Sequence, residues 1–218
     1  TRRMWGYLIQ RKSEATIRIV ALLGWCKNQD RRVKFVRMDP AGENKAMTLM
    51  LIGDGIKPEF SPVDTPQYNG VAERAIAVCK EGAHALMLDS NCDMKWWGAA
   101  TLDYITVANM RLRNGWPNAY APFNEPPPRT PSSLIPFGCP GMMKQKKKRL
   151  CKNFTPKSEA VFRVGYDNYS TKDSYLVVKT SNERVVSTRN VTWDRSYKIK
   201  LKTPSPPMHP AADHEQDV

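Results

Sequence analysis

Two carboxylates, Asp39 and Glu73, stand at positions suited to phosphoryl-transfer chemistry. Asp39 directly follows a short apolar run at 33–38 that is typical of a buried strand. Glu73 lies in the first turn of a long helical pattern at about 69–89. Carboxylate oxygens are the ligands that Mg²⁺ prefers, and two bound ions can clamp an in-line displacement. The pair therefore predicts binding of Mg²⁺ (or Mn²⁺) by Asp39 and Glu73.

The patterns around these carboxylates predict an α/β layer, in which ligands lie at strand ends. Apolar residues recur at helical spacing in some segments and form short runs bounded by turn residues in others. The expected elements are a strand at 4–9, a helix at 13–27, a strand at 33–38, a helix at 44–52, an extended piece at 56–61, and helices at 69–89 and 94–111.

Two sequence blocks resemble the integrase core of copia-type retrotransposons. Residues 37–44 read Arg-Met-Asp-Pro-Ala-Gly-Glu-Asn, and residues 68–74 read Tyr-Asn-Gly-Val-Ala-Glu-Arg. In that family the blocks hold the second Asp and the final Glu of an Asp, Asp, Glu catalytic triad. The resemblance implies Asp39 and Glu73 as catalytic residues and metal ligands, within a ribonuclease-H-like fold whose early strands are cut off.

The same resemblance implies a function. It implies metal-dependent 3′-end processing and strand transfer of element DNA into a target, with DNA as the partner and a homo-oligomer left open. The scattered cysteines, expected to be reduced, fit a location in the nucleus and cytoplasm. Two departures matter: Pro40 replaces the usual Asn, and the family's first Asp has no equivalent ahead of Asp39. We therefore expect these 218 residues, as given, not to cut or join DNA. A catalytically dead nucleic-acid-binding remnant is the alternative, whereas the second block and the trailing β segments disfavour a cellular nuclease or transposase.

Composition supports a polyanionic partner. The net charge is +13, with 41% hydrophobic and 25% charged residues, which favours nucleic acid over a membrane for a globular chain. The cysteines are five in number and form no Cys-x-x-Cys pair, so we expect reduced thiols and no zinc site.

Several cations are candidates for phosphate contacts. One follows Glu73 by two helical turns, and four belong to a basic segment at 144–157 that contains no acid. A solvated lysine is the alternative for the first, and a nuclear-import signal or a solvated loop for the others. The DNA-binding candidates are Lys80, Lys146, Lys147, Lys148 and Arg149.

The chain divides into four predicted parts. They are a truncated catalytic core at 1–113, a proline-rich linker without a helix at 114–143, a basic segment with a small β-barrel module at 144–201, and a disordered tail at 202–218. Short strands are expected at 160–166, 174–179 and 185–192. Trp96 and Trp97 are expected to pack their helix against a sheet, rather than to stack on bases.

Overall fold

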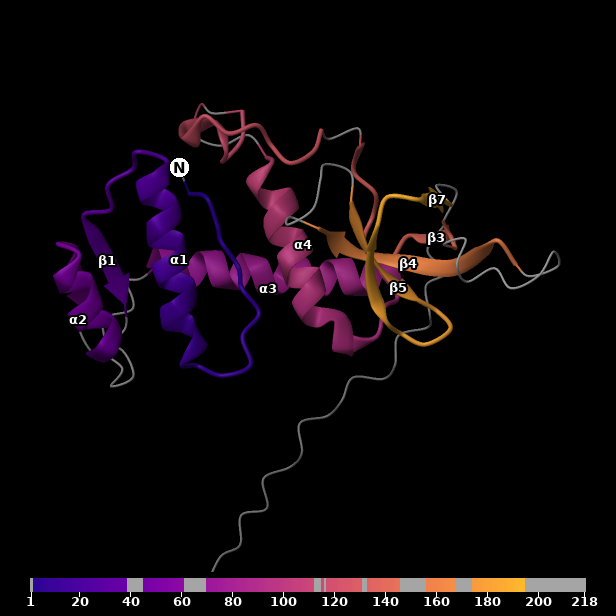
Figure 1. Cartoon of the computed structure of the whole chain (residues 1–218), viewed down its shortest axis with the longest axis horizontal. Coiled ribbons are helices and arrows are strands. Elements are labelled where there is room, and N and C mark those ends of the chain that lie inside the picture. The colour runs from indigo at the N-terminus through magenta and orange to yellow at the C-terminus, as the bar shows by residue number, and fades with distance from the viewer. Residues whose placement is uncertain are drawn as a thin grey trace, which may run out of the picture.

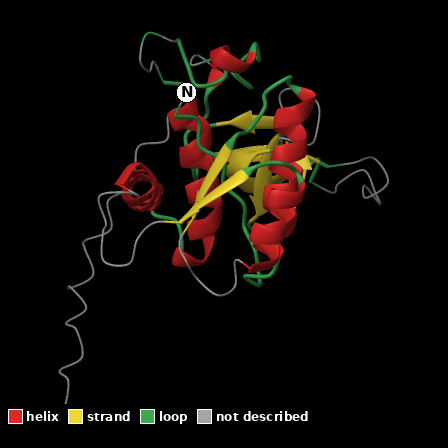
Figure 2. Ribbon diagram, turned by 90° about the vertical axis from the view of Figure 1, so that its left-hand side faces the viewer, coloured by secondary structure: helices red, strands yellow, loops and turns green. Residues whose placement is uncertain are grey.

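The computed structural model shows a mixed α/β protein with two sheets of different size (Figure 1). It describes residues 2–38, 45–60, 70–111, 115, 117–130, 133–145, 156–167 and 174–194. Figure 2 shows helices on both sides of the strands. The elements are α1 (Glu14–Asn28), β1 (Phe35–Met38), α2 (Lys45–Gly53), β2 (Lys57–Phe60), α3 (Gly70–Ser90), η3 (Met94–Trp96), α4 (Trp97–Asn109), η4 (Ala121–Phe123), β3 (Pro140–Lys144), β4 (Ser158–Tyr166), β5 (Tyr175–Lys179), β6 (Val185–Thr188) and β7 (Val191–Trp193).

Helix α1, strand β1, helix α2 and strand β2 form what we call the N-terminal unit. Strands β1 and β2 pair in parallel, with Phe35 opposite Lys57 and Met38 opposite Phe60, and α2 connects them. Apolar side chains from α1, α2 and the strand ends make one small cluster, whose buried members are Met38, Met47, Leu51 and Ile56. The predicted strand–helix–strand order of this region is confirmed.

Helices α3 and α4 and the second sheet form what we call the C-terminal body. The five antiparallel strands follow the order β6-β5-β4-β3-β7, so β6 and β7 lie at the two ends of the described sheet. The sheet packs on the helices, and their shared core contains Ala83 and Met87 of α3, Ala100 of α4, and Phe137, Val164 and Val178. A Cβ at Gly82 would overlap the Tyr104 ring, so this glycine allows α3 and α4 to approach closely.

A buried ion pair joins the sheet of the C-terminal body to its helices. Arg163 of β4 donates two hydrogen bonds to the Asp103 carboxylate of α4, one of them at 3.1 Å. The ring of Tyr166 lies 3.9 Å from the Arg163 guanidinium. Burial raises the pKa of the Asp103 carboxyl, and the Arg163 charge opposes that rise. Because removing two charges from water is costly, this pair fixes the docking geometry more than it adds net stability.

The predicted strand at 4–9 is wrong. This segment is not part of either sheet and lies across α4 instead, where Met4 forms two hydrogen bonds with the Asn109 side-chain amide, at 3.0 and 2.7 Å. A Cβ at Gly6 would meet Leu102 and Ile105, and Leu8 lies against Gly98. The apolar run is therefore satisfied by helix packing, and Asn109 takes the place of a neighbouring strand.

Two further expectations about secondary structure are corrected. The stretch 114–143, expected to contain no helix, includes the 3₁₀ turn η4, and the sheet strand β3 begins within it. The single strand expected at 185–192 is two strands, β6 and β7. Strand β6 pairs with β5 and β7 pairs with β3, and between them the Asn190 N–H donates to Thr188 Oγ1 at 3.1 Å. The strands expected at 160–166 and 174–179 are confirmed as β4 and β5.

Candidate functional site

Glu73 lies in the first turn of α3 and is exposed to solvent. The helix dipole favours a carboxylate at this position. Within the described part of the chain Glu73 forms no ion pair, so both of its oxygens are accessible. Lys80 and His84 follow on the same side of α3, two and three turns along, and both are exposed. The helix therefore presents one carboxylate and two nitrogen groups along one side.

Strand β1 leads to the second predicted carboxylate. Its last residue, Met38, is buried in the N-terminal unit, and the residue that follows in the sequence is Asp39. Arg37 forms an ion pair with Glu59 of β2 at 2.9 Å, which ties the two strands together on their exposed side. Asp39 itself lies outside the described residues, so its distance from Glu73 is not part of the structure.

A groove brings the end of β1 and the beginning of α3 together. It has a volume of about 1140 Å³, and its lining includes Arg37 of β1 as well as Val71, Ala72 and Arg74 of α3. These residues flank Asp39 and Glu73 in the sequence. The groove continues along α3 past Lys80 and His84 to Met87, and α4 contributes Trp97 to it. Residues that are distant in the sequence thus line one groove, although Glu73 itself is not among its lining residues.

The other predicted DNA contacts are not placed by the structure. Lys146, Lys147, Lys148 and Arg149 lie outside the described residues. Among the residues that are described, no group of three His, Cys, Asp or Glu side chains could hold a metal ion. The side chains of the described residues Cys26, Cys79, Cys92 and Cys139 are not joined in disulfide bonds.

The two neighbouring tryptophans differ in their surroundings. Trp96 packs edge-on against Phe162 of β4, with ring centroids 6.0 Å apart, as expected for a residue that holds its helix against a sheet. Trp97 does not: its side chain is largely exposed and lines the groove. The change from the 3₁₀ turn η3 to helix α4 falls between these residues, and it turns their side chains to different sides.

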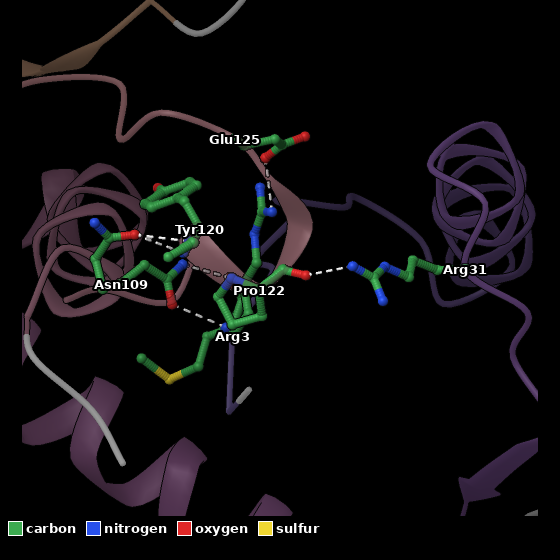
Figure 3. A network of polar contacts seen from close by, with 9 residues as sticks. Arg3, Arg31, Asn109, Tyr120, Pro122 and Glu125 are labelled. Carbon is green, nitrogen blue, oxygen red and sulfur yellow. Dashed lines mark hydrogen bonds and ion pairs between the residues drawn. The ribbon is translucent and has the colours of Figure 1, made fainter. Parts of the chain in front are cut away.

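An aromatic cluster around Arg3 was not predicted. The Arg3 guanidinium lies between 4.5 and 5.0 Å from the ring centroids of four aromatic residues. It also pairs with Glu125 at 2.8 Å (Figure 3). Arg31 donates to the Pro122 carbonyl at 2.6 Å nearby. The four aromatic residues are Trp5, Trp25, Tyr120 and Phe123.

This cluster fixes the first residues of the chain to α1 and η4. Its members are spread over more than a hundred positions, so no local pattern in the sequence indicates it. Burial raises the pKa of the Tyr120 hydroxyl, and the Arg3 charge opposes that rise. The cluster positions Arg2 to Trp5, which form one side of the groove.

Comparison with known proteins gives a single kind of match. Neither a protein-family profile nor the sequence of a curated protein matches the chain. Similar solved structures include the simian T-cell lymphotropic virus intasome in complex with PP2A regulatory subunit B56 gamma, determined by cryo-electron microscopy. The identity is 12%, the TM-score is 0.40, and the match covers 85% of this chain and 66% of that chain.

At this similarity we transfer no residue role from the viral protein.

No helix in the described residues is both long and apolar enough to cross a membrane.

Proposed function

We propose that this chain is the DNA-handling core of an integrase similar to those of copia-type retrotransposons. The observation that carries the proposal is the shared groove, because Arg37 precedes Asp39 and Val71 to Arg74 surround Glu73. Residues from both sequence blocks that resemble the family's catalytic blocks therefore line one groove, which supports the proposal.

The proposal includes a reading of the architecture. A parallel strand pair joined by a helix, followed by the helix that bears Glu73, is consistent with part of a ribonuclease-H-like layer. The five-stranded sheet corresponds in this reading to the small β-barrel module that follows the core in the family. Strands β6 and β7 at the two ends of that sheet would be the ones to close it.

The proposed metal ligands are Asp39 and Glu73. The exposed Glu73 carboxylate, with no ion pair among the described residues, fits the oxygen donors that Mg²⁺ or Mn²⁺ requires. A bound ion would supply a positive charge beside the phosphoryl oxygens of DNA. The residues of this chain would then hold the DNA, with Lys80 contacting a phosphate two turns away from Glu73.

Metal binding tests the site without requiring turnover. Loss of the free Mn²⁺ electron paramagnetic resonance signal should show weak binding, about millimolar, since only two carboxylates are involved. Asp39→Asn and Glu73→Gln should each abolish it. Glu81→Gln is the matched control, because Glu81 is exposed on the same helix but points to another side. Unchanged Mn²⁺ binding in Glu73→Gln would show that this site is wrongly assigned.

DNA binding tests the second half of the proposal. If Lys80 and the basic residues Lys146, Lys147, Lys148 and Arg149 contact phosphates, affinity should fall steeply with salt. Reversing the four charges at 146–149 should reduce affinity about 100-fold at low salt without changing sequence preference. Binding that is insensitive to salt would contradict phosphate recognition.

The second candidate is a catalytically inert nucleic-acid-binding remnant of a retroelement. Pro40 favours it, because proline removes a backbone donor beside Asp39 and stiffens that turn. The two candidates differ in metal dependence. A remnant would bind DNA with the salt dependence described above but would not bind Mn²⁺, whereas the integrase core should do both.

A further inference from the structure

The groove beside α3 has an apolar floor that the proposed DNA chemistry does not use. Four of its large apolar side chains are more than half exposed: Val71 (65%) and Ile76 (55%) on α3, Met94 (65%) on η3 and Trp97 (59%) on α4. An apolar patch of this kind on a protein surface commonly marks an interaction site. These four side chains therefore indicate a binding surface for a partner with an apolar face.

The rim of the groove is positively charged. Arg74 and Lys80 of α3 line it, together with Arg2 and with Arg37 of β1, which also pairs with Glu59. None of the described lining residues is an Asp or a Glu. Arg74 and Lys80 form no ion pair within the described part of the chain. The charge of the rim is thus complementary to acidic groups.

The groove extends along α3 for several helical turns. Its lining residues on α3 run from Gly70 to Met87, which corresponds to a length of about 26 Å at the helical rise of 1.5 Å per residue. Its volume of about 1140 Å³ lies above the range of about 300–1,000 Å³ that is usual for small-molecule sites. Met4 and Met94 add flexible apolar side chains of the kind found at adaptable peptide-binding surfaces.

We propose that this groove binds an amphipathic polypeptide helix whose apolar stripe is bordered by acidic residues. The apolar stripe would cover Val71, Ile76 and Trp97, and the acidic residues would face Arg74 and Lys80. A second copy of the same groove is a poor occupant, since cations would face cations. Duplex DNA would leave the aliphatic floor in contact with a polar, charged backbone.

This inference does not depend on a metal or on Asp39, so it stands apart from the proposed integrase function. The two share the groove itself and Lys80, which we also assign to a DNA phosphate. A bound helix and bound DNA should therefore compete for the groove.

The probe is a fluorescein-labelled 18-residue peptide of Leu, Ala, Gln and Glu, with Leu at helical spacing and Glu on both borders of the stripe. One comparison peptide has Lys in place of each Glu, and a second has the same composition with the Leu residues dispersed. Fluorescence anisotropy against the full chain should show binding of the first peptide at least about tenfold tighter than either comparison peptide. Equal binding of the acidic and basic peptides would overturn the proposal.

Variants of the chain locate the binding. Ile76→Gln alters the floor at an exposed position, and Arg74→Glu with Lys80→Glu reverses the rim, so neither should disturb folding, which circular dichroism can verify. Each of these variants should weaken binding of the acidic peptide about tenfold. The matched control is Arg184→Glu with Arg189→Glu, the same charge change at exposed positions of the second sheet, which should leave affinity within about twofold.

Two outcomes would contradict the assignment. If the control pair weakens the peptide as much as the rim pair, the attraction is a general effect of net charge. If Ile76→Gln weakens binding of a 16-base-pair DNA duplex as much as it weakens binding of the peptide, the groove is a nucleic-acid-binding surface instead.

Discussion

The N-terminal unit and the C-terminal body each contain an arginine–carboxylate pair, in contrasting surroundings. Arg163 and Asp103 join β4 to α4, and their side chains are 0% and 2% exposed. Arg37 and Glu59 join β1 to β2 and are 50% and 32% exposed. The same chemical groups therefore serve as a buried determinant of packing in one region and as a solvated contact in the other.

The difference extends to the apolar packing. In the C-terminal body, a five-stranded sheet and two helices share a core, whereas the N-terminal unit buries one small cluster over two four-residue strands. Sheets of only two strands depend on packing against helices for their stability. We therefore expect the N-terminal unit to open at a lower free energy than the body. Both regions line the groove. Its α3 side should therefore be rigid, whereas its β1 side should adapt to a ligand.

The largest effect should come from breaking the buried pair. Asp103→Ala leaves the Arg163 guanidinium buried without its counter-charge, which should lower the free energy of unfolding by about 3–5 kcal/mol. Urea unfolding followed by tryptophan fluorescence measures this change. Asp89→Ala, at an exposed position of α3, is the control and should change stability by less than about 0.5 kcal/mol. Similar losses in both variants would mean that the buried pair has no special role.

The next effect separates the two regions directly. Leu51 is fully buried in the small cluster, so Leu51→Ala should destabilise the N-terminal unit by about 2–4 kcal/mol. Amide hydrogen exchange should then accelerate in α2 and β2 about 30-fold or more, and β4 and β5 should exchange as before. Equal acceleration in all four elements would show that the chain unfolds as a single unit.

Periodicity in the sequence was sufficient to predict the helices and most strands. The apolar spacing of α1, α3 and α4 is local, so it can be recognised without knowledge of the fold. The segment at 4–9 was misassigned because an apolar run cannot reveal whether its partner is a strand or the side of a helix. Here the partner is α4, which lies about a hundred residues further along the chain.

The site was predicted only in part, for a similar reason. The helical pattern that begins near residue 69 was sufficient to predict Glu73 in the first turn of α3. The exposed apolar floor of the groove could not be predicted in this way. Helical spacing identifies a face of α3 but not which part of that face remains uncovered. Ile76 and Met87 both line the groove, yet only Met87 is buried. Trp97 was misassigned because a one-residue shift at the start of a helix turns a side chain by about 100°.

The same Gly→Ala substitution should change stability in opposite directions at two glycines within helices. A Cβ at Gly24 of α1 would meet open space, so Gly24→Ala should stabilise the chain by about 0.5–1 kcal/mol through helix propensity. At Gly82 of α3 the same change would overlap the Tyr104 ring, and the overpacking cost of about 1–3 kcal/mol should exceed that gain. Thermal unfolding of the two variants measures both shifts. Stabilisation by both changes would mean that α3 and α4 can move apart freely.

The smallest effect should come from the exposed pair, and it completes the comparison with the buried one. Glu59→Gln removes the carboxylate charge that faces Arg37, but water can solvate both side chains, so the loss should be only about 0.2–1 kcal/mol. Because salt screens exposed charges, the difference between wild type and Glu59→Gln should vanish in about 1 M NaCl. The Asp103→Ala loss should persist under the same conditions, since ions do not reach that pair. Urea unfolding of both variants at low and high salt therefore tests whether burial, rather than the identity of the charged groups, sets the contribution of each pair. A loss in Glu59→Gln that rivals the loss in Asp103→Ala, or that survives high salt, would mean that the N-terminal unit depends on its surface charges far more than its exposure suggests.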